Sequence, residues 1–176
     1  MGTFFYVGIG IYQFNFSIFL KDIFKWGPAL VGSIFTLIGA CDIVSRAVLL
    51  PLFLKKFSER NIGIVGLFGL GIGLSLILLS IYINSTYLII SAVICITLGE
   101  GLFDPSYNGR LSQSVDESEQ GKLQGVNQSL QAAYRVLVPL GAAAIYFYSP
   151  GILYGIATFI AIGALIMFTK IKPQYV

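Results

Sequence analysis

Long apolar segments alternate with short polar breaks along the whole chain. A helix needs about 20 consecutive, mostly apolar residues to cross a bilayer. By this criterion we predict six transmembrane helices, at about residues 2–20, 28–54, 62–82, 87–110, 121–148 and 152–168. The pattern therefore predicts an all-α membrane protein in which residues 1–176 form a single six-helix bundle.

The breaks contain the polar, glycine and proline residues that are typical of loops. They read KDIFKWGP, KKFSERN, INST, SQSVDESEQGK and SPG. In the longest break, Ser114 and Glu117 have the spacing of a capping box, which marks a helix N-terminus. The fifth helix is therefore expected to begin slightly outside the membrane.

Basic residues are concentrated at one set of helix ends. The second loop, the fourth loop and the C-terminus carry Lys55, Lys56, Arg60, Arg110, Lys122, Lys170 and Lys172. The opposite ends have only Lys21 and Lys25, near the interfacial aromatic residues Trp26, Tyr82, Tyr87 and Tyr148. Because cytoplasmic loops are enriched in Lys and Arg, this predicts a multi-pass protein of the plasma (inner) membrane with both termini in the cytoplasm.

The composition indicates the same class of protein. Hydrophobic residues make up 56% of the chain and charged residues 11%, and there is no His, a balance that argues against a soluble domain. Cys41 and Cys95 lack the spacing of a disulfide framework or a zinc site, so no metal or other cofactor is expected. The net charge of +3 lies mostly at membrane edges, so the expected partner is the lipid bilayer and not nucleic acid.

Glycines are closely spaced in the third predicted helix, at Gly63, Gly66, Gly69, Gly71 and Gly73. Their Gly-x-Gly pieces lack the strand, the helix-opening loop and the later acidic residue of a nucleotide-binding fingerprint. Close packing against another helix is the expected role.

Residues 19–66 carry the first part of a family resemblance. The loop from Lys21 to Gly27 has a K/D-x-F-x-W/G pattern and leads into a helix with small residues, then a basic loop: Gly32, Gly39, Lys55, Lys56, Glu59 and Arg60. This stretch resembles the end of the seventh helix, the eighth helix and the following loop of the major facilitator superfamily, especially its tetracycline and multidrug efflux branch. Where that family usually has Gly before the Glu, this chain has Ser58.

Residues 105–139 carry the second part. They resemble the tenth helix end, the cytoplasmic loop and the eleventh helix of that branch, at Pro105, Leu111, Ser112, Glu119, Gly121, Gly125, Gln128, Ser129, Arg135 and Pro139. The resemblance covers essentially the whole chain and implies the C-terminal six-helix half of a major-facilitator fold, with the family's N-terminal half absent from this sequence. Because substrate binds between the two halves of such carriers, a separate N-terminal half or a second copy of the chain is an expected partner.

Five charged residues fall inside the predicted helices: Asp42, Arg46, Glu100, Asp104 and Arg135. A charge at the centre of a membrane helix costs roughly 2.5 to 3.5 kcal/mol on insertion scales, so such residues are candidates for function. Asp42 and Arg46 are four residues apart, which is the spacing of an intrahelical ion pair. Two roles stay open for them, a structural ion pair or a pair in which one member faces the cavity and handles substrate or protons.

Glu100 and Asp104 are also four residues apart, so both carboxylates and Asn108 project from one face of the fourth helix. Two nearby acids repel each other when both are ionised, which suits a site that binds and releases a proton. Glu100 is the leading proton-coupling candidate, and Asp42 and Asp104 are further candidates. The alternative for Asp104 is a polar helix end, with Asp104 paired to Arg110.

Polar residues on the fifth predicted helix form one stripe, at Gln124, Gln128, Gln131 and Arg135. Such a stripe should face protein or water and not lipid, so Gln128, Gln131 and Arg135 are expected at the substrate cavity. Arg135 either neutralises Asp42 or Glu100 or contacts substrate directly.

The first predicted helix carries Tyr6, Gln13 and Ser17 at i, i+7 and i+11, with Asn15 nearby among many aromatic residues. The resemblance places this helix beside the central cavity, so Gln13 and Asn15 are expected substrate contacts. Their alternative role is hydrogen bonding between helices.

These features predict a proton-coupled secondary active transporter that exports drugs, with a small-molecule substrate and protons as its transported partners. Two alternatives stay open, a truncated or degenerate remnant that transports nothing and a homodimer that rebuilds the pathway from two copies. An enzyme is not expected, because the isolated carboxylates lack a nucleophile, a metal site or a phosphate-binding loop.

Overall fold

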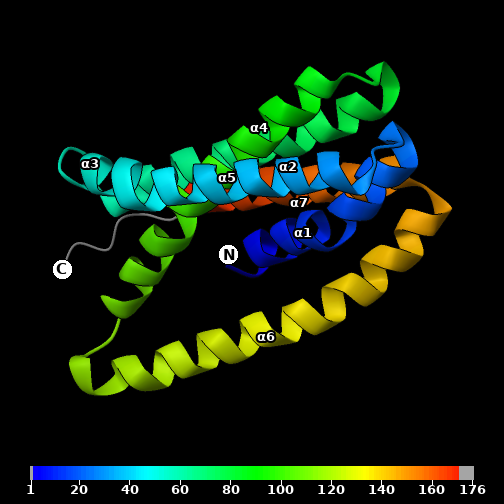
Figure 1. The fold of residues 1–176 in the computed structure, drawn as a ribbon. Helices are drawn as coiled ribbons and strands as arrows, with labels where there is room; N and C mark the ends of the chain where they lie inside the picture. The colour runs from blue at the N-terminus through cyan, green and yellow to red at the C-terminus, as the bar shows by residue number, and fades with distance from the viewer. Residues whose placement is uncertain (1, 171–176) are drawn as a thin grey trace.

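The computed structural model describes residues 2–170, and these residues are almost entirely helical (Figure 1). The elements in chain order are α1 (Gly2–Phe24), α2 (Pro28–Val44), the π-helical turn η1 (Ser45–Leu49), α3 (Leu50–Leu54), α4 (Glu59–Ile83), α5 (Thr86–Ser112), α6 (Glu117–Tyr148) and α7 (Pro150–Lys170). Within this part of the chain, six helices are long and apolar enough to cross a membrane, with Pro28–Leu54 as one of them. The prediction of an all-α fold with six transmembrane helices is therefore confirmed.

Several helices extend beyond their apolar segments. α1 continues to Phe24, and α4 begins at Glu59, where the Ser58 side chain accepts a hydrogen bond from the Asn61 amide at 3.4 Å. Of the basic residues at the predicted cytoplasmic ends, Lys172 lies outside the described residues. Arg60, Arg110 and Lys122 therefore lie within helices near their ends, whereas Lys55 and Lys56 lie in the turn between α3 and α4.

The predicted capping box at Ser114 is wrong. The N-cap of α6 is Asp116, and the Ser114 hydroxyl donates instead to the Leu111 carbonyl at the end of the preceding helix, at 2.7 Å. The reason is that α5 and α6 are separated by only a few residues, so Ser114 still belongs to the turn that closes α5. α6 nevertheless begins ahead of its apolar segment, as expected.

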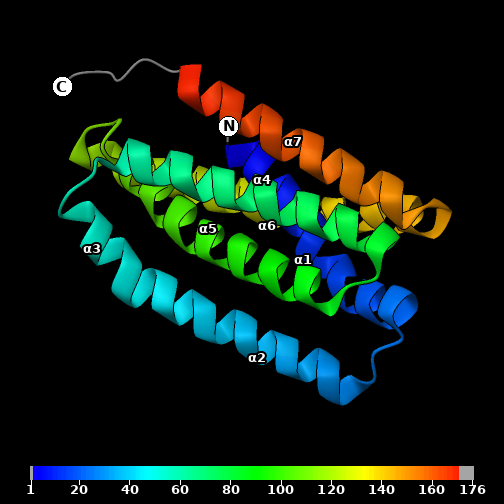
Figure 2. The same ribbon diagram turned by 90° about the horizontal axis from the view of Figure 1, so that it is seen from above.

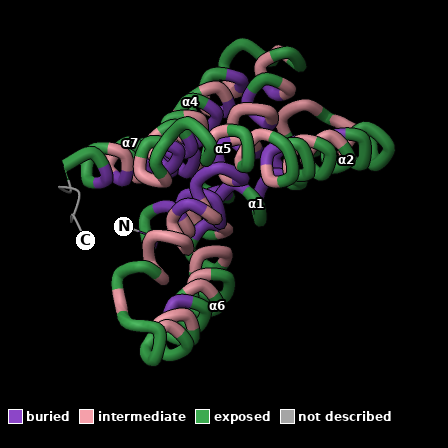
Figure 3. Tube along the Cα trace, turned by 90° about the vertical axis from the view of Figure 1, so that its left-hand side faces the viewer, coloured by how far each residue is buried: buried purple, intermediate pink, exposed green. Residues whose placement is uncertain are grey.

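Four helices make the buried core, and two lie at its periphery. Between 33% and 56% of the central residues of α1, α4, α5 and α7 are buried, against 6% for the Pro28–Leu54 span and 11% for α6. Figure 2 shows α2 along one edge of the bundle, and Figure 3 shows buried residues gathered away from α2 and α6. Lipid or further protein must therefore cover most of the apolar surface of these two helices.

The closest helix packing is between α4 and α5, at the glycines of α4. A Cβ atom on Gly66 would lie 2.6 Å from the Gly99 carbonyl oxygen, and one on Gly73 would lie 2.8 Å from the Ala92 carbonyl oxygen. Gly69 faces the Cys95 carbonyl in the same way, at 3.0 Å. The predicted close helix packing is therefore confirmed for Gly66, Gly69 and Gly73, and it does not hold for Gly71, where a Cβ atom would meet nothing within 4 Å.

The π-helical turn η1 brings the second membrane span against α5. Ser45 is fully buried, and its hydroxyl donates to the Leu98 carbonyl at 3.0 Å. Gly101 makes this approach possible, because a Cβ atom there would lie 2.5 Å from the Ser45 Oγ. A π turn changes which face of a helix its residues occupy, and here the next residue, Arg46, lies beside α5.

Candidate functional site

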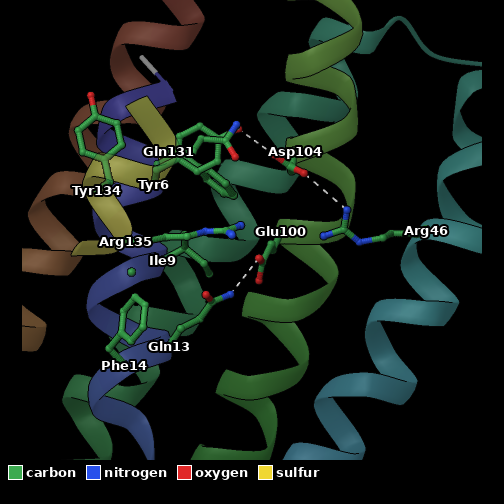
Figure 4. A pocket seen from close by; sticks show the side chains of 12 residues that line it. Tyr6, Ile9, Gln13, Phe14, Arg46, Glu100, Asp104, Gln131, Tyr134 and Arg135 are labelled. Carbon is green, nitrogen blue, oxygen red and sulfur yellow. Dashed lines mark hydrogen bonds and ion pairs between the residues drawn. The ribbon is translucent and has the colours of Figure 1, made fainter. Parts of the chain in front are cut away.

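A pocket of about 290 Å³ lies between α1, η1, α5 and α6, and it contains most of the candidate residues (Figure 4). The residues that line it are Phe5, Tyr6, Ile9, Gly10, Gln13, Phe14, Arg46, Glu100, Asp104, Gln131, Tyr134 and Arg135. Four separate membrane spans therefore meet at one small polar cavity.

Arg46 joins two carboxylates from different helices. Its Nε donates to Asp42 Oδ1 at 2.7 Å, and its Nη1 lies 3.5 Å from Asp104 Oδ2 on α5. The expected intrahelical pair of Asp42 and Arg46 is present, and it is extended to a third member. The alternative pairing of Asp104 with Arg110 is wrong, because residues six apart occupy different faces of a helix and Arg110 instead lies over the Phe168 ring, 5.5 Å from its centroid.

Asp104 is also the centre of a hydrogen-bond network that reaches α1 and α6. The Tyr6 hydroxyl donates to Asp104 Oδ1 at 2.8 Å and accepts a hydrogen bond from Gln131 Nε2 at 2.8 Å. Asn108 Nδ2 donates to the same carboxylate oxygen at 3.1 Å, and Asn127 Nδ2 donates to Asn108 Oδ1 at 2.9 Å. This network holds the Asp104 carboxylate in place from three helices.

Glu100 is held much more loosely. Gln13 Nε2 donates to Glu100 Oε1 at 3.1 Å, which is its one side-chain hydrogen bond among residues 2–170. Figure 4 shows the Arg135 side chain reaching toward Glu100 across the pocket, yet no ion pair joins these two described residues. Glu100 is therefore the pocket carboxylate that has the most freedom to change its partner.

The charges at the site do not cancel. Two carboxylates and two guanidinium groups line the pocket, and a third carboxylate, Asp42, binds Arg46 from outside the lining. The sum over these five groups is one negative charge when all are ionised. A net charge in a site with low dielectric is costly unless a counter-charge is present. The arrangement can therefore hold one proton or one positively charged group.

Two of the expected cavity residues lie elsewhere. Asn15 is only 3% exposed and donates to the Ile11 carbonyl of its own helix at 3.3 Å. Two residues along a helix turn a side chain by about 200°, so Asn15 points away from the pocket that Gln13 faces. Gln128 is exposed on α6, and its neighbour Asn127 is the residue that turns inward. Neither Asn15 nor Gln128 therefore lines this pocket, and their role as substrate contacts stays a prediction.

Other residues at the site were not among the expected cavity residues. Tyr6 lies seven residues before Gln13 and so on the same face of α1, and this spacing is the sequence feature that predicts Tyr6 at the pocket. Tyr134 lines the pocket and donates to Thr3 Oγ1 at 2.9 Å. It lies beside Arg135 in the sequence, and an aromatic residue in an apolar helix carries no signal that separates a cavity position from a lipid-facing one.

Comparison with known proteins gives a consistent result. The model of a family described as Major Facilitator Superfamily matches residues 1–175. The chain is 31% identical to the class H tetracycline resistance protein of Pasteurella multocida over 132 residues, which are 75% of this chain and 32% of that protein. It is 26% identical to the class C tetracycline resistance protein of Escherichia coli over 140 residues, which are 80% of this chain and 34% of that protein.

These matches agree with the resemblance that the loops and the fifth membrane span indicate in the sequence. The chain spans about a third of the length of the curated relatives it matches, and no solved structure matches it. Six membrane-spanning helices of this kind fit one half of the family's fold. The chain is a multi-pass membrane protein, and it belongs to the major facilitator superfamily.

Proposed function

We propose that this chain is one half of a proton-coupled carrier that exports amphipathic drugs. The observation that carries the proposal is the polar pocket between four membrane spans, which is lined by two carboxylates and two arginines. A third carboxylate, Asp42, lies outside the lining and binds Arg46. Intramembrane ionisable residues that face a cavity mark substrate and proton pathways. A carrier, and not an enzyme, is the activity that fits such a site.

Glu100 is the proposed proton-coupling residue. Asp104 is fixed by Arg46, Tyr6 and Asn108, whereas Glu100 has a single amide partner in Gln13. Protonation of Glu100 removes the excess negative charge of the site, and loss of this proton restores it. Exchange of substrate for a proton follows if both compete for the charge at this position.

The substrate is proposed to be a drug with ring systems and polar edges. The relatives named above are tetracycline resistance proteins. The pocket lining offers both aromatic and polar surfaces to such a molecule. Phe5, Phe14 and Tyr134 offer ring faces, and Gln13 and Gln131 offer amide groups. Arg135 is proposed to face the substrate or Glu100 from α6.

A second set of six helices is proposed to complete the pathway. The spans that contain α2 and α6 are the least buried of the described residues, and the relatives are about three times as long as the match. A second half encoded separately or in a longer chain, or a second copy of this chain, would cover these helices. The basic helix ends favour an assembly in the plasma membrane with both termini in the cytoplasm.

The test is transport in inside-out membrane vesicles. The chain is expressed alone and together with a six-helix N-terminal half, and tetracycline uptake is measured with and without an imposed proton gradient. Gradient-dependent uptake supports the carrier, and uptake by the chain alone supports a homodimer. No uptake in either arrangement contradicts the proposal and favours the non-transporting remnant.

A further inference from the structure

A second pocket lies at the end of the bundle where α1 ends and α2 begins, apart from the candidate functional site. Figures 1 and 2 show this end, at the turn between α1 and α2. The pocket has a volume of about 780 Å³. Its lining combines cations and an indole ring with apolar side chains, among them Lys21, Lys25, Trp26, Ile18, Val31 and Phe35.

The lysines of this pocket are not neutralised. Lys21 and Lys25 are both exposed, and within residues 2–170 neither forms an ion pair. The acid in the lining, Asp22, accepts a hydrogen bond from the Tyr146 hydroxyl at 3.2 Å. Two lysines and one aspartate leave one positive charge, so the pocket favours an anion.

The loop between the helices is held in a defined shape. Lys25 has a φ of 55°, in the left-handed region, and this turns the chain back toward the bundle. The Trp26 amide then donates to the Leu20 carbonyl at 3.3 Å, and the Trp26 ring packs edge-on against Phe24 with centroids 5.5 Å apart. Trp26 is therefore a fixed wall of the pocket.

The polar and apolar parts of the pocket match the layers of a bilayer. α1 has 23 residues, and at about 1.5 Å per residue it is roughly as long as the hydrocarbon core is thick. Lys21, Lys25 and Trp26, at its end, therefore lie at the level of the lipid headgroups. Val31 and Phe35 lie one and two turns into α2, at the depth of the acyl chains.

We propose that this pocket binds an anionic phospholipid of the adjacent leaflet. The phosphate lies between Lys21 and Lys25, and an acyl chain lies along Ile18, Val31 and Phe35. Basic pockets between transmembrane helices bind anionic headgroups in this way. The pocket carries one net positive charge, which an anionic lipid neutralises and a zwitterionic lipid does not. The proposal is independent of whether the chain transports drugs.

Trp26 allows a direct test, because it is the one tryptophan of the chain and it lines this pocket. The purified chain is reconstituted in phosphatidylcholine vesicles that contain increasing fractions of brominated phosphatidylglycerol or brominated phosphatidylcholine. Bromine quenches tryptophan fluorescence on contact. We expect brominated phosphatidylglycerol to reach half-maximal quenching at a mole fraction about tenfold lower than brominated phosphatidylcholine does, because two basic residues at a membrane surface attract the anionic headgroup.

Charge-matched variants separate this pocket from general surface attraction. Lys21→Gln with Lys25→Gln should abolish the preference for the anionic lipid. Lys55→Gln with Lys56→Gln removes the same charge at the opposite end of the α2 to α3 span and should leave the preference unchanged. Lys21→Arg with Lys25→Arg should also keep it, which distinguishes lost binding from lost folding.

Three results would overturn the proposal. The first is equal quenching by the two brominated lipids in the unaltered chain, and the second is a preference that survives the Lys21→Gln and Lys25→Gln changes. The third is displacement of brominated phosphatidylglycerol by an equimolar amount of glycerol phosphate, because a phosphate without acyl chains should not compete for a site that also holds a lipid tail.

Discussion

Arg46 and Glu100 show why single residues of this site have different roles although all are ionisable. Arg46 contacts Asp42 and Asp104 at once, so each of these acids has a cation as a direct partner. Glu100 has an amide as its partner and no ion pair within the described residues. A carboxylate without a bound cation has the most to gain from taking up a proton, which separates Glu100 from Asp42 and Asp104.

The first prediction concerns the charge of Glu100. Glu100→Gln keeps the size of the side chain and its contact with Gln13, but it removes the carboxylate that is proposed to bind the proton. Proton movement driven by tetracycline in reconstituted vesicles should fall to the level of protein-free vesicles, measured with an internal pH-sensitive dye. Glu119→Gln, an exposed acid at the start of α6, is the matched control and should leave it unchanged. Full coupling in the Glu100 variant would remove this residue from the mechanism.

The second prediction concerns the hydroxyl of Tyr6. Tyr6→Phe removes the donor to Asp104 and the acceptor for Gln131, so it should lower the free energy of unfolding by about 1 to 3 kcal/mol. Thermal unfolding of the detergent-solubilised protein measures this change. Tyr82→Phe is the control, since Tyr82 is 76% exposed and removal of its hydroxyl breaks no hydrogen bond to another described residue. Equal melting temperatures for the two variants would show that the Tyr6 network adds no stability.

The sequence predicts the candidate residues well where helical spacing decides their direction. Gln13, Gln131 and Arg135 were expected at the cavity and line the same pocket. Spacing fails where neighbouring polar residues compete for one inward position, as with Asn127 and Gln128. A rotation of about 100° separates adjacent helical residues, and the sequence of α6 does not fix it to that precision.

At the scale of the elements, the helices were predictable from their apolar length, whereas the π turn at Ser45–Leu49 was not. The segment SRAVL itself has no proline or glycine, but Pro51 follows two residues later and has no amide N–H to donate to the Ala47 carbonyl, which interrupts the regular helix. Packing against another helix accommodates the turn, because Gly101 leaves the space into which Ser45 fits. Local sequence therefore predicts that Arg46 is in the membrane, and tertiary packing decides which carboxylates it reaches.

The third prediction concerns the contact between α4 and α5. Gly66→Ala places a Cβ atom 2.6 Å from a backbone oxygen of α5, so the helices must separate, and overpacking of this kind costs about 1 to 3 kcal/mol. Gly71→Ala on the same helix meets nothing within 4 Å and should raise stability by about 0.5 to 1 kcal/mol through its helix propensity. Thermal unfolding in one detergent compares the two, and a Gly66 variant as stable as the Gly71 variant would contradict the close packing.

For the whole molecule, the distribution of burial agrees with a chain that needs a partner or lipid over two of its spans. Val136, Leu137 and Leu140 on α6 are each more than 60% exposed, although the same helix contributes Gln131 and Arg135 to the pocket. The family resemblance implies the same arrangement, since it places a second half beside the cavity. Composition alone does not predict a second half, because lipid covers exposed apolar side chains as well as protein does.

The orientation that the charge distribution predicts, with both termini in the cytoplasm, can be tested by labelling. The test compares two variants, Thr86→Cys and Ser118→Cys, in a chain whose Cys41 and Cys95 are replaced by alanine. Both positions are exposed. Thr86 is at the start of α5, and Ser118 is at the start of α6, next to the other end of α5. Because Lys and Arg are retained in the cytoplasm, a membrane-impermeant maleimide should label the residue 86 variant in intact cells. The residue 118 variant should react only after the membrane is opened. The reverse pattern would place both termini outside the cell and the Lys21 and Lys25 pocket in the cytoplasmic leaflet.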